Sequence, residues 1–394
     1  MSDPTTRLNL YERALHALLA RLRYGTLSVQ TPSGRLVEAH GSLPGPQAVL
    51  VLHNWRVLFA LLLEGNTGFA TSYIAGHWSS PDLTALLTVC ALNFNHTGNS
   101  IFSLPLRLLQ RFRHKQRVNS RAGSKRNIMA HYDLGNEFFA AWLDETMLYS
   151  SALYHKSQET LAQAQANKCR LVQSWLDVPH GGNVLEIGCG WGALARILAV
   201  AGASVTGLTL SPAQQHYAQA LIDKAALNDH VTIALRDYRD ETGLYDRIVS
   251  IEMFEAVGET YWSDYFKTLH ARLKPGGRVV LQIISIAAEN FSNYRENSDF
   301  IQSHIFPGGM LPTKAGVAVL GAKAGLSLQR VTYFGPSYAR TLADWHTRFL
   351  SAWPKLEAMG FDQRFQRLWA YYLCYCQAGF NTGRIDVGLY EFLG

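Results

Sequence analysis

The stretch Val184–Gly192, which reads Val-Leu-Glu-Ile-Gly-Cys-Gly-Trp-Gly, constrains the fold of this chain more than any other. An apolar strand, Asn183–Ile187, leads into a turn with three glycines, and a helical pattern over Ala193–Ala201 follows at once. Glycines let the backbone turn sharply and let a ligand lie against the main chain. Because the turn ends at a helix N-terminus, free N–H groups favour polar or anionic ligand groups. The pattern predicts a nucleotide-type cofactor site at the carboxyl end of the first strand of an open α/β sheet.

Two classes of cofactor are compatible with this turn. Gly188, Gly190 and Ala193 satisfy the dinucleotide pattern G-x-G-x-x-G/A. A dinucleotide site also needs an acidic residue about 20 positions later to bind the ribose, but the second strand, 204–208, ends in the neutral run Thr-Leu-Ser. Glu186 lies two residues before the first glycine, and with it the stretch resembles motif I of S-adenosylmethionine (SAM) methyltransferases. We therefore expect SAM rather than NAD.

Strand and helix patterns alternate along the second half of the chain, which is typical of a doubly wound, Rossmann-like α/β sheet. The further strands are expected at 204–208, 231–235, 247–251, 278–284, 327–334 and 385–392, with helices at 160–175, 212–225, 262–273, 342–353 and 363–378. We expect a small N-terminal α+β domain over 1–105, a basic linker over 106–127, and a SAM-methyltransferase domain over 128–394. A lid insertion is expected around 287–316.

Composition indicates a globular protein with a large core, since 48% of the 394 residues are hydrophobic and 17% are charged. No apolar run has the length of a membrane span, and the polar first residues lack the apolar core of a signal peptide, so we expect a cytoplasmic protein. The five cysteines are scattered and offer no four-ligand zinc site, so no metal is expected. The formal charge of +6 favours an anionic partner, either nucleic acid or a lipid surface.

The expected linker is the most basic stretch of the chain. Its basic residues are Arg107, Arg111, Arg113, Lys115, Arg117, Arg121, Lys125 and Arg126. A solvated connector explains them as well as a patch for phosphate headgroups, in which each basic residue contributes on the order of 1 kcal/mol near an anionic membrane. Both interpretations stay open.

A series of short motifs from residue 131 onward gives the chain a family resemblance. In order they are His131-Tyr132-Asp133, Tyr149-Ser150, Glu186–Gly192, Leu208–Ser211 with Gln214-Gln215, Asp237-Tyr238-Arg239, Met253-Phe254-Glu255, Phe306-Pro307-Gly308-Gly309 and Trp345 with Arg348-Phe349. Together they resemble cyclopropane-fatty-acyl-phospholipid synthases and the related mycolic acid cyclopropane synthases. The N-terminal domain resembles the extra domain of the bacterial phospholipid enzymes.

The resemblance implies a role for particular residues. The implied SAM-binding residues are Tyr149, Ser150, Glu186, Gly188, Cys189, Gly190, Gly192, Thr209, Leu210, Gln214, Asp237 and Tyr238. Tyr132 would help to close the substrate pocket. The implied catalytic centre comprises Glu255, Tyr338, Gln282, Ser151 and the backbone at Ile284. The family methylates a cis double bond of an acyl chain and uses bound bicarbonate to remove a proton from the resulting carbocation.

The chain departs from the family pattern where bicarbonate would bind. The family has cysteine at the position of Ser151 and histidine at the position of Gln282. It also has histidine at Ala256. Glutamine cannot carry a positive charge, so anion binding should be weaker or different. These departures affect ring closure more than methyl transfer. We expect a cyclopropane product, and the alternative is a methyl-branched or furan-precursor chain formed without ring closure.

The expected substrate is an unsaturated phospholipid acyl chain at an anionic membrane surface, with the protein peripherally associated with the inner face of the membrane. Nucleic acid is not expected as a partner, and the sequence leaves a homodimer open. Two other classes compete with this interpretation. A non-catalytic lipid-binding protein is disfavoured by the intact glycine motif and Glu255, and a small-molecule or nucleic-acid methyltransferase is disfavoured by the absence of an amino-methylation motif such as Pro-Pro.

Overall fold

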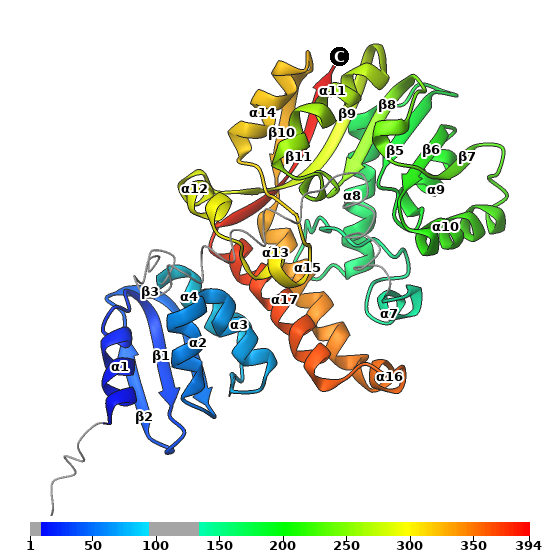
Figure 1. Ribbon diagram of the computed structural model, residues 1–394. Helices are drawn as coiled ribbons and strands as arrows, with labels where there is room; N and C mark the ends of the chain where they lie inside the picture. The colour runs from blue at the N-terminus through cyan, green and yellow to red at the C-terminus, as the bar shows by residue number, and fades with distance from the viewer. Residues whose placement is uncertain (1–8, 94–133) are drawn as a thin grey trace, which may run out of the picture. The chain divides into compact units, whose positions relative to one another are not determined.

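The computed structural model describes residues 9–93 and 134–394 (Figure 1). Within these ranges the chain forms two compact units. One unit consists of residues 9–93 and 357–382, and the other of residues 134–356 and 383–394. The expected basic linker, with the basic residues between 107 and 126, and Tyr132 lie outside the described residues.

The first unit is a four-stranded sheet with helices. Its sheet has the order β2-β1-β3-β4, in which β1 is antiparallel to β2 and parallel to β3. The strands are β1 (Tyr24–Gln30), β2 (Leu36–His40), β3 (Leu43–Leu52) and the short β4 (Trp78–Ser79). The helices of its N-terminal part are α1 (Leu10–Leu19), α2 (Arg56–Glu64), α3 (Asn66–Ile74) and α4 (Leu83–Asn93). The mixture of helices and strands in this unit agrees with the expected α+β composition, although α3 and β4 were not expected.

Helix α17 (Gln363–Asn381) belongs to this first unit, whereas we expected it in the methyltransferase domain. The ring of Tyr371 packs against those of Tyr73 and Trp78 at centroid distances of 5.6 and 6.4 Å. Thr84 in α4 donates a hydrogen bond of 2.9 Å to Gln377. Helical periodicity predicts that an apolar face is buried but not which sheet or helix buries it, so the assignment of this helix needed the structure.

The second unit is built on a seven-stranded sheet of order β10-β11-β9-β8-β5-β6-β7. Six of the seven strands point in the same direction, and β11 is antiparallel to both of its neighbours, β9 and β10. The strands are β5 (Asn183–Ile187), β6 (Ser204–Thr209), β7 (Val231–Leu235), β8 (Tyr245–Ile251), β9 (Leu273–Ile286), β10 (Ser327–Tyr333) and β11 (Ile385–Leu393). The predicted doubly wound, Rossmann-like methyltransferase sheet is therefore confirmed.

Helices cover both faces of this sheet (Figure 1). One face carries α8 (Leu161–Leu176), α9 (Ala193–Val200) and α10 (Pro212–Lys224), and the other carries α11 (Trp262–Arg272) and α14 (Lys314–Lys323). The remaining elements are α7 (Asn136–Ala140), η2 (Tyr238–Asp240), η3 (Phe254–Ala256), η4 (Glu259–Tyr261), α12 (Ala288–Glu296), α13 (Phe300–His304), α15 (Gly335–Ser351) and α16 (Trp353–Ala358). Helices α12 and α13 occupy the sequence range in which a lid insertion was expected. No helix among the described residues is long and apolar enough to cross a bilayer.

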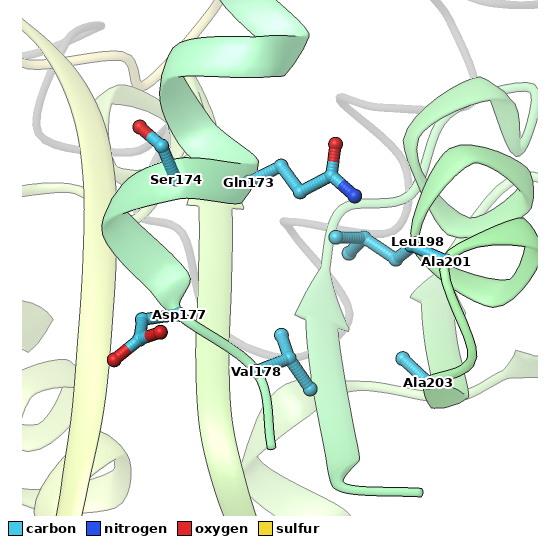
Figure 2. A pocket seen from close by; sticks show the side chains of 7 residues that line it. All are labelled: Gln173, Ser174, Asp177, Val178, Leu198, Ala201 and Ala203. Carbon is cyan, nitrogen blue, oxygen red and sulfur yellow. The ribbon is translucent and has the colours of Figure 1, made fainter. Parts of the chain in front are cut away.

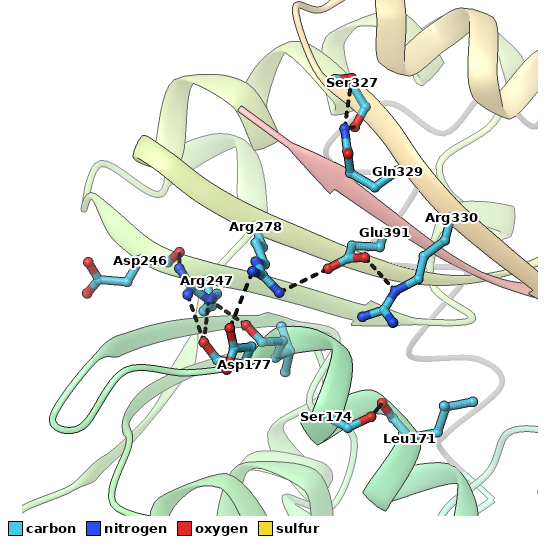
Figure 3. A network of polar contacts seen from close by, with 11 residues as sticks. Leu171, Ser174, Asp177, Asp246, Arg247, Arg278, Ser327, Gln329, Arg330 and Glu391 are labelled. Atoms are coloured by element: carbon cyan, nitrogen blue, oxygen red, sulfur yellow. Dashed lines mark hydrogen bonds and ion pairs between the residues drawn. The ribbon is translucent and has the colours of Figure 1, made fainter.

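A network of hydrogen bonds and ion pairs connects β11, the last strand of the chain, to the neighbouring strands (Figure 3). Glu391, whose side chain is only 7% exposed, accepts a hydrogen bond of 2.6 Å from Arg330 in β10 and one of 3.3 Å from Arg278 in β9. Arg278 also pairs with Asp177 at the end of α8. Because a buried carboxylate is costly without partners, this pairing favours one register for β11 between β9 and β10.

Candidate active site

The glycine-rich turn follows β5 and has the conformation that the sequence predicts. The N–H groups of Gly188 and Cys189 both donate to the carbonyl of Leu208 at 2.9 Å, which joins the turn to β6. Gly190 has φ +53°, and a Cβ added there would meet no described atom within 4 Å. Its backbone therefore faces open space, as a turn that carries a ligand on its main chain requires. Burial raises the pKa of the Cys189 thiol well above its ordinary value, so Cys189 is not set up as a nucleophile.

Glu186 lies beneath this turn and is 3% exposed. One side of its carboxyl group accepts the backbone N–H of Ala195 in α9, and burial raises its pKa to about 8. Its Oε2 atom is buried and has no hydrogen-bond partner among the described residues. Such an atom is an acceptor available to a ligand group that donates a hydrogen bond, so this part of the site suits a cofactor with a polar, amine-bearing portion.

The ends of β6 and β7 carry other predicted cofactor residues. Thr209 donates a hydrogen bond of 2.9 Å to Gln214, and both side chains are buried.

Asp237 lies just after the end of β7, and its carboxylate receives two hydrogen bonds from Arg239, at 2.8 and 2.6 Å. Tyr238 packs edge-to-face on Tyr265 with ring centroids 5.1 Å apart. Leu210 is half-buried and Gly192 precedes the first residue of α9. These residues follow adjacent parallel strands, so the structure places them at one edge of the sheet.

Tyr149 and Ser150 approach the same edge from the segment before α8. The ring of Tyr149 contacts those of Phe139, Trp142 and Trp345 at centroid distances between 5.3 and 5.6 Å. These rings form an aromatic wall, and Trp142 and Trp345 are fully buried. The Oγ atom of Ser150 accepts a hydrogen bond from the buried Nζ of Lys168 at 2.6 Å.

The predicted catalytic residues converge on a side chain that the sequence did not single out. Glu252, the first residue after β8, accepts the backbone N–H of Ser151 at 2.8 Å and the side-chain amide of Gln282 at 2.6 Å, both on Oε1. Its Oε2 accepts the hydroxyl hydrogen of Tyr338 at 2.6 Å. The backbone N–H of Glu252 in turn donates to the carbonyl of Gln282 at 2.8 Å. A glutamate directly at the carboxyl end of a central parallel strand was the signal that could have identified it.

Glu255 lies one short turn further along the chain. Its Oε1 accepts the backbone N–H of Ile284 in β9, and its Oε2 is buried without a partner among the described residues. Burial, together with the negative charge of Glu252, raises the pKa of Glu255 to about 8. At neutral pH Glu255 therefore holds a proton while Glu252 receives the hydrogen bonds.

The side chains at this centre do not fit the bicarbonate ion that the family resemblance implied. Gln282 and Tyr338 direct their donors to Glu252, and so does the backbone of Ser151. The Ser151 hydroxyl donates to the carbonyl of Ala152 at 2.9 Å. A carboxylate of the protein thus occupies the donors that would hold the anion, so the structure gives no support to the expected bicarbonate.

A separate pocket lies at the opposite edge of the sheet, between the C-terminal ends of α8 and α9 (Figure 2). It has a volume of about 230 Å³ and is lined mainly by small and apolar side chains with Gln173, Ser174 and Asp177. Asp177 is two-thirds exposed and pairs with Arg278. None of the predicted site residues lines this pocket, so it is not part of the candidate active site.

Comparison with known proteins identifies the family. Residues 119–389 match the family model described as mycolic acid cyclopropane synthetase. The chain belongs to this family. It is therefore a SAM-dependent methyltransferase.

Individual relatives agree with this family. The chain is 40% identical to the tuberculostearic acid methyltransferase UfaA1 of Mycobacterium tuberculosis, over 90% of this chain and 86% of the relative. It is 34% identical to the cyclopropane-fatty-acyl-phospholipid synthase of Escherichia coli, over 89% of this chain and 88% of the relative. The crystal structure of mycolic acid cyclopropane synthase CmaA1 complexed with SAH and CTAB matches with a TM-score of 0.64 and 29% identity, and covers 68% of this chain and 98% of the other.

Proposed function

We propose that the protein transfers the methyl group of SAM to the cis double bond of an unsaturated phospholipid acyl chain and forms a methyl-branched chain. The observation that carries the reaction class is the group of half-buried carboxyl side chains and aromatic rings at the carboxyl edge of the sheet, next to the glycine turn. Glu252 and Glu255 supply the carboxyl groups, and Tyr149, Trp142 and Trp345 supply the rings.

The chemistry of an alkene explains why such a site suits this reaction. SAM supplies an electrophilic methyl group, but an isolated double bond is a poor nucleophile and must be held at near-attack distance. A carbocation results, and water would capture it, so its surroundings must be dry. The aromatic wall around Tyr149 excludes water, and its ring faces stabilise positive charge. A carboxylate within the same centre accepts the proton that the cation loses.

Two products are supported by different relatives. The relative with 40% identity is named for tuberculostearic acid, a methyl-branched acid, and its match covers most of both chains. The departures at Ser151 and Gln282 favour the same product, since they remove the side chains expected to hold bicarbonate. Cyclopropane formation is the second candidate, because the family model and the relative of E. coli are named for it.

Lipid analysis tests the proposed function directly. Expression of the protein in a bacterial host rich in unsaturated phospholipids, followed by mass spectrometry of the fatty acids, is expected to show a gain of one methyl or methylene carbon. Fragmentation or NMR then separates a branched chain from a ring. Cells that express the Gly190→Leu variant serve as the control. Unchanged fatty acids in the presence of folded, SAM-binding wild-type protein would refute an acyl-chain substrate.

We further propose that the protein acts at the inner face of the membrane and binds anionic lipid. The support is the net charge of +6 and the basic residues between 107 and 126. Co-sedimentation with vesicles that contain anionic phospholipid should fall as salt rises, because exposed charges are screened over about 8–10 Å at physiological ionic strength. Binding that ignores both salt and lipid charge would contradict this proposal.

A further inference from the structure

We propose that Glu252 is the catalytic base, a carboxylate built into the chain that takes the proton from the methylated acyl cation, so that the enzyme needs no added anion. This inference rests on the proposed methylation of an acyl double bond. It concerns a residue that neither the sequence motifs nor the family resemblance assigned to the site.

Donors from three separate segments converge on the carboxylate of Glu252. Ser151 comes from the segment before α8, Gln282 from β9 and Tyr338 from α15, and all three donate to Glu252 within 2.8 Å. Hydrogen bonds to an ionised carboxylate are short and strong, and three of them fix its orientation. A carboxylate has about four acceptor positions. Among the described residues only one donor lies on Oε2, so this oxygen keeps a position for a proton.

The backbone of Glu252 has an unusual conformation. Its φ is +49°, in the left-handed region that glycine adopts easily and that is strained for other residues. Neither of its two oxygens is needed to cap a helix or to pair with a surface cation. A strained backbone that directs a half-buried acid into a cluster of donors is typical of a functional position rather than of a structural one.

The groups around Glu252 affect its affinity for a proton. Burial raises the pKa of Glu252 above its ordinary 4.5, while the hydrogen bonds from Tyr338, Ser151 and Gln282 and the charge of Lys168 oppose this shift. Glu255 is the protonated member of the acidic pair at neutral pH, since its pKa is about 8. The three hydrogen bonds that Glu252 accepts favour its ionised form, and the raised pKa makes it a stronger base than a carboxylate in water.

The step balances without any further reactant. The π electron pair of the alkene forms a bond to the methyl carbon as the bond from that carbon to the sulfonium sulfur breaks, and the sulfur keeps the electron pair. The neighbouring alkene carbon becomes cationic. A C–H bond beside the cation then breaks, its electron pair neutralises the cationic carbon by forming a new C–C bond or double bond, and the proton binds Oε2 of Glu252. Glu252 returns the proton to solvent before the next turnover.

The Glu252→Gly variant provides the sharpest test, because glycine suits the observed φ and leaves the backbone donors of the site in place. It should fold and bind SAM as the wild type does, as measured by thermal unfolding and calorimetry. Transfer of radiolabelled methyl groups to unsaturated phospholipid vesicles should fall by about 10²–10⁴-fold, the usual effect of losing a general base. Bicarbonate, formate or acetate should restore part of this rate by occupying the vacated donors, and none of them should accelerate the wild type.

A matched control separates the loss of the base from the loss of a strained residue. Ala226, after α10, has φ +55°, so Ala226→Gly relieves a similar backbone strain far from the centre and should leave the rate unchanged. A Glu252→Gly variant that binds SAM and methylates lipid at the wild-type rate would overturn the role of Glu252, and so would a wild-type rate that depends on bicarbonate. If the wild type itself binds SAM but transfers no methyl group to lipid, the proposed function fails, and the proposed base fails with it.

Discussion

Lys168 and Ser150 form a buried hydrogen bond of 2.6 Å that links helix α8 to the segment carrying the predicted cofactor residues. Lys168 is only 2% exposed, and burial lowers its pKa, while the charges of Glu252, Asp144 and Glu186 oppose this shift. Lys168 thus interacts electrostatically with acidic side chains of both the glycine turn and the candidate catalytic centre. This connection gives the two halves of the site a common electrostatic support.

Replacement of Lys168 by methionine should therefore destabilise the protein and weaken SAM binding. The substitution leaves the buried Ser150 hydroxyl without its donor, and a buried polar group that loses its partner typically costs about 1–3 kcal/mol. Urea unfolding measures the loss. Lys267→Met is the control, since Lys267 and Asp264 form an exposed pair at 3.9 Å, worth about 0–1 kcal/mol. Equal unfolding midpoints for the two variants would show that Lys168 has no such role.

Gly190→Leu should abolish SAM binding while the fold persists. The added side chain would project into the open space that the turn faces, and the positive φ adds a cost of roughly 1–2 kcal/mol. Gly181→Leu carries the same backbone cost, because Gly181 has φ +70° and equally open surroundings, but it lies before β5 and away from the turn. Calorimetry should detect SAM binding only for the Gly181 variant. Unchanged affinity of the Gly190 variant would remove the glycine turn from the SAM site.

The sequence predicted the central sheet well because its strands are short, apolar and bounded by turns. The ranges 183–187 and 231–235 agree with β5 and β7 to the residue. Helix α15 begins at Gly335 rather than at 342, because Pro336 occupies its first turn, where the missing N–H costs nothing. Local pattern also could not show that β11 inserts between β9 and β10, since this placement depends on pairs such as Glu391 with Arg330.

The residues of the candidate catalytic centre were predicted less completely than the strands of the sheet. Motif resemblance identified Ser151, Gln282, Tyr338 and Glu255, and the structure brings these residues to one edge of the sheet. It did not identify Glu252, although Glu252 is the residue that three of them contact. Two of its donors, Ser151 and Tyr338, lie 101 and 86 positions from Glu252 in the sequence, so no local sequence pattern relates them to it.

Stability should fall as pH rises from about 4.5 to about 8. Glu255 has a pKa near 8 in the folded protein against an ordinary 4.5, so the folded state keeps a proton that the unfolded state has lost over this interval. The contribution of Glu255 to the free energy of unfolding is complete below pH 4.5 and is lost as the pH approaches 8. This free energy falls by at most about 1.4 kcal/mol per pH unit on account of Glu255. Burial raises the pKa of Glu186 to about 8 as well, so Glu186 also lowers the stability of the folded state as the pH rises.

Urea unfolding of wild type and Glu255→Gln between pH 5 and pH 8 measures this effect. Glutamine mimics the protonated side chain at every pH, so the stability of the variant should depend less steeply on pH than that of the wild type. Parallel curves for the two proteins would mean that Glu255 does not hold its proton in the folded state.

The product of the reaction should depend on Glu252 rather than on Ser151 and Gln282 alone. The double variant Ser151→Cys with Gln282→His restores the family residues, but Glu252 still fills the space among the donors, so we expect it to form the same branched product as the wild type. Addition of Glu252→Gly vacates that space. The triple variant should then require bicarbonate for methylation, and cyclopropane lipid should be found by NMR of its products. Ring formation by the double variant without added bicarbonate would instead show that Ser151 and Gln282 determine the product, with Glu252 playing no part in that choice.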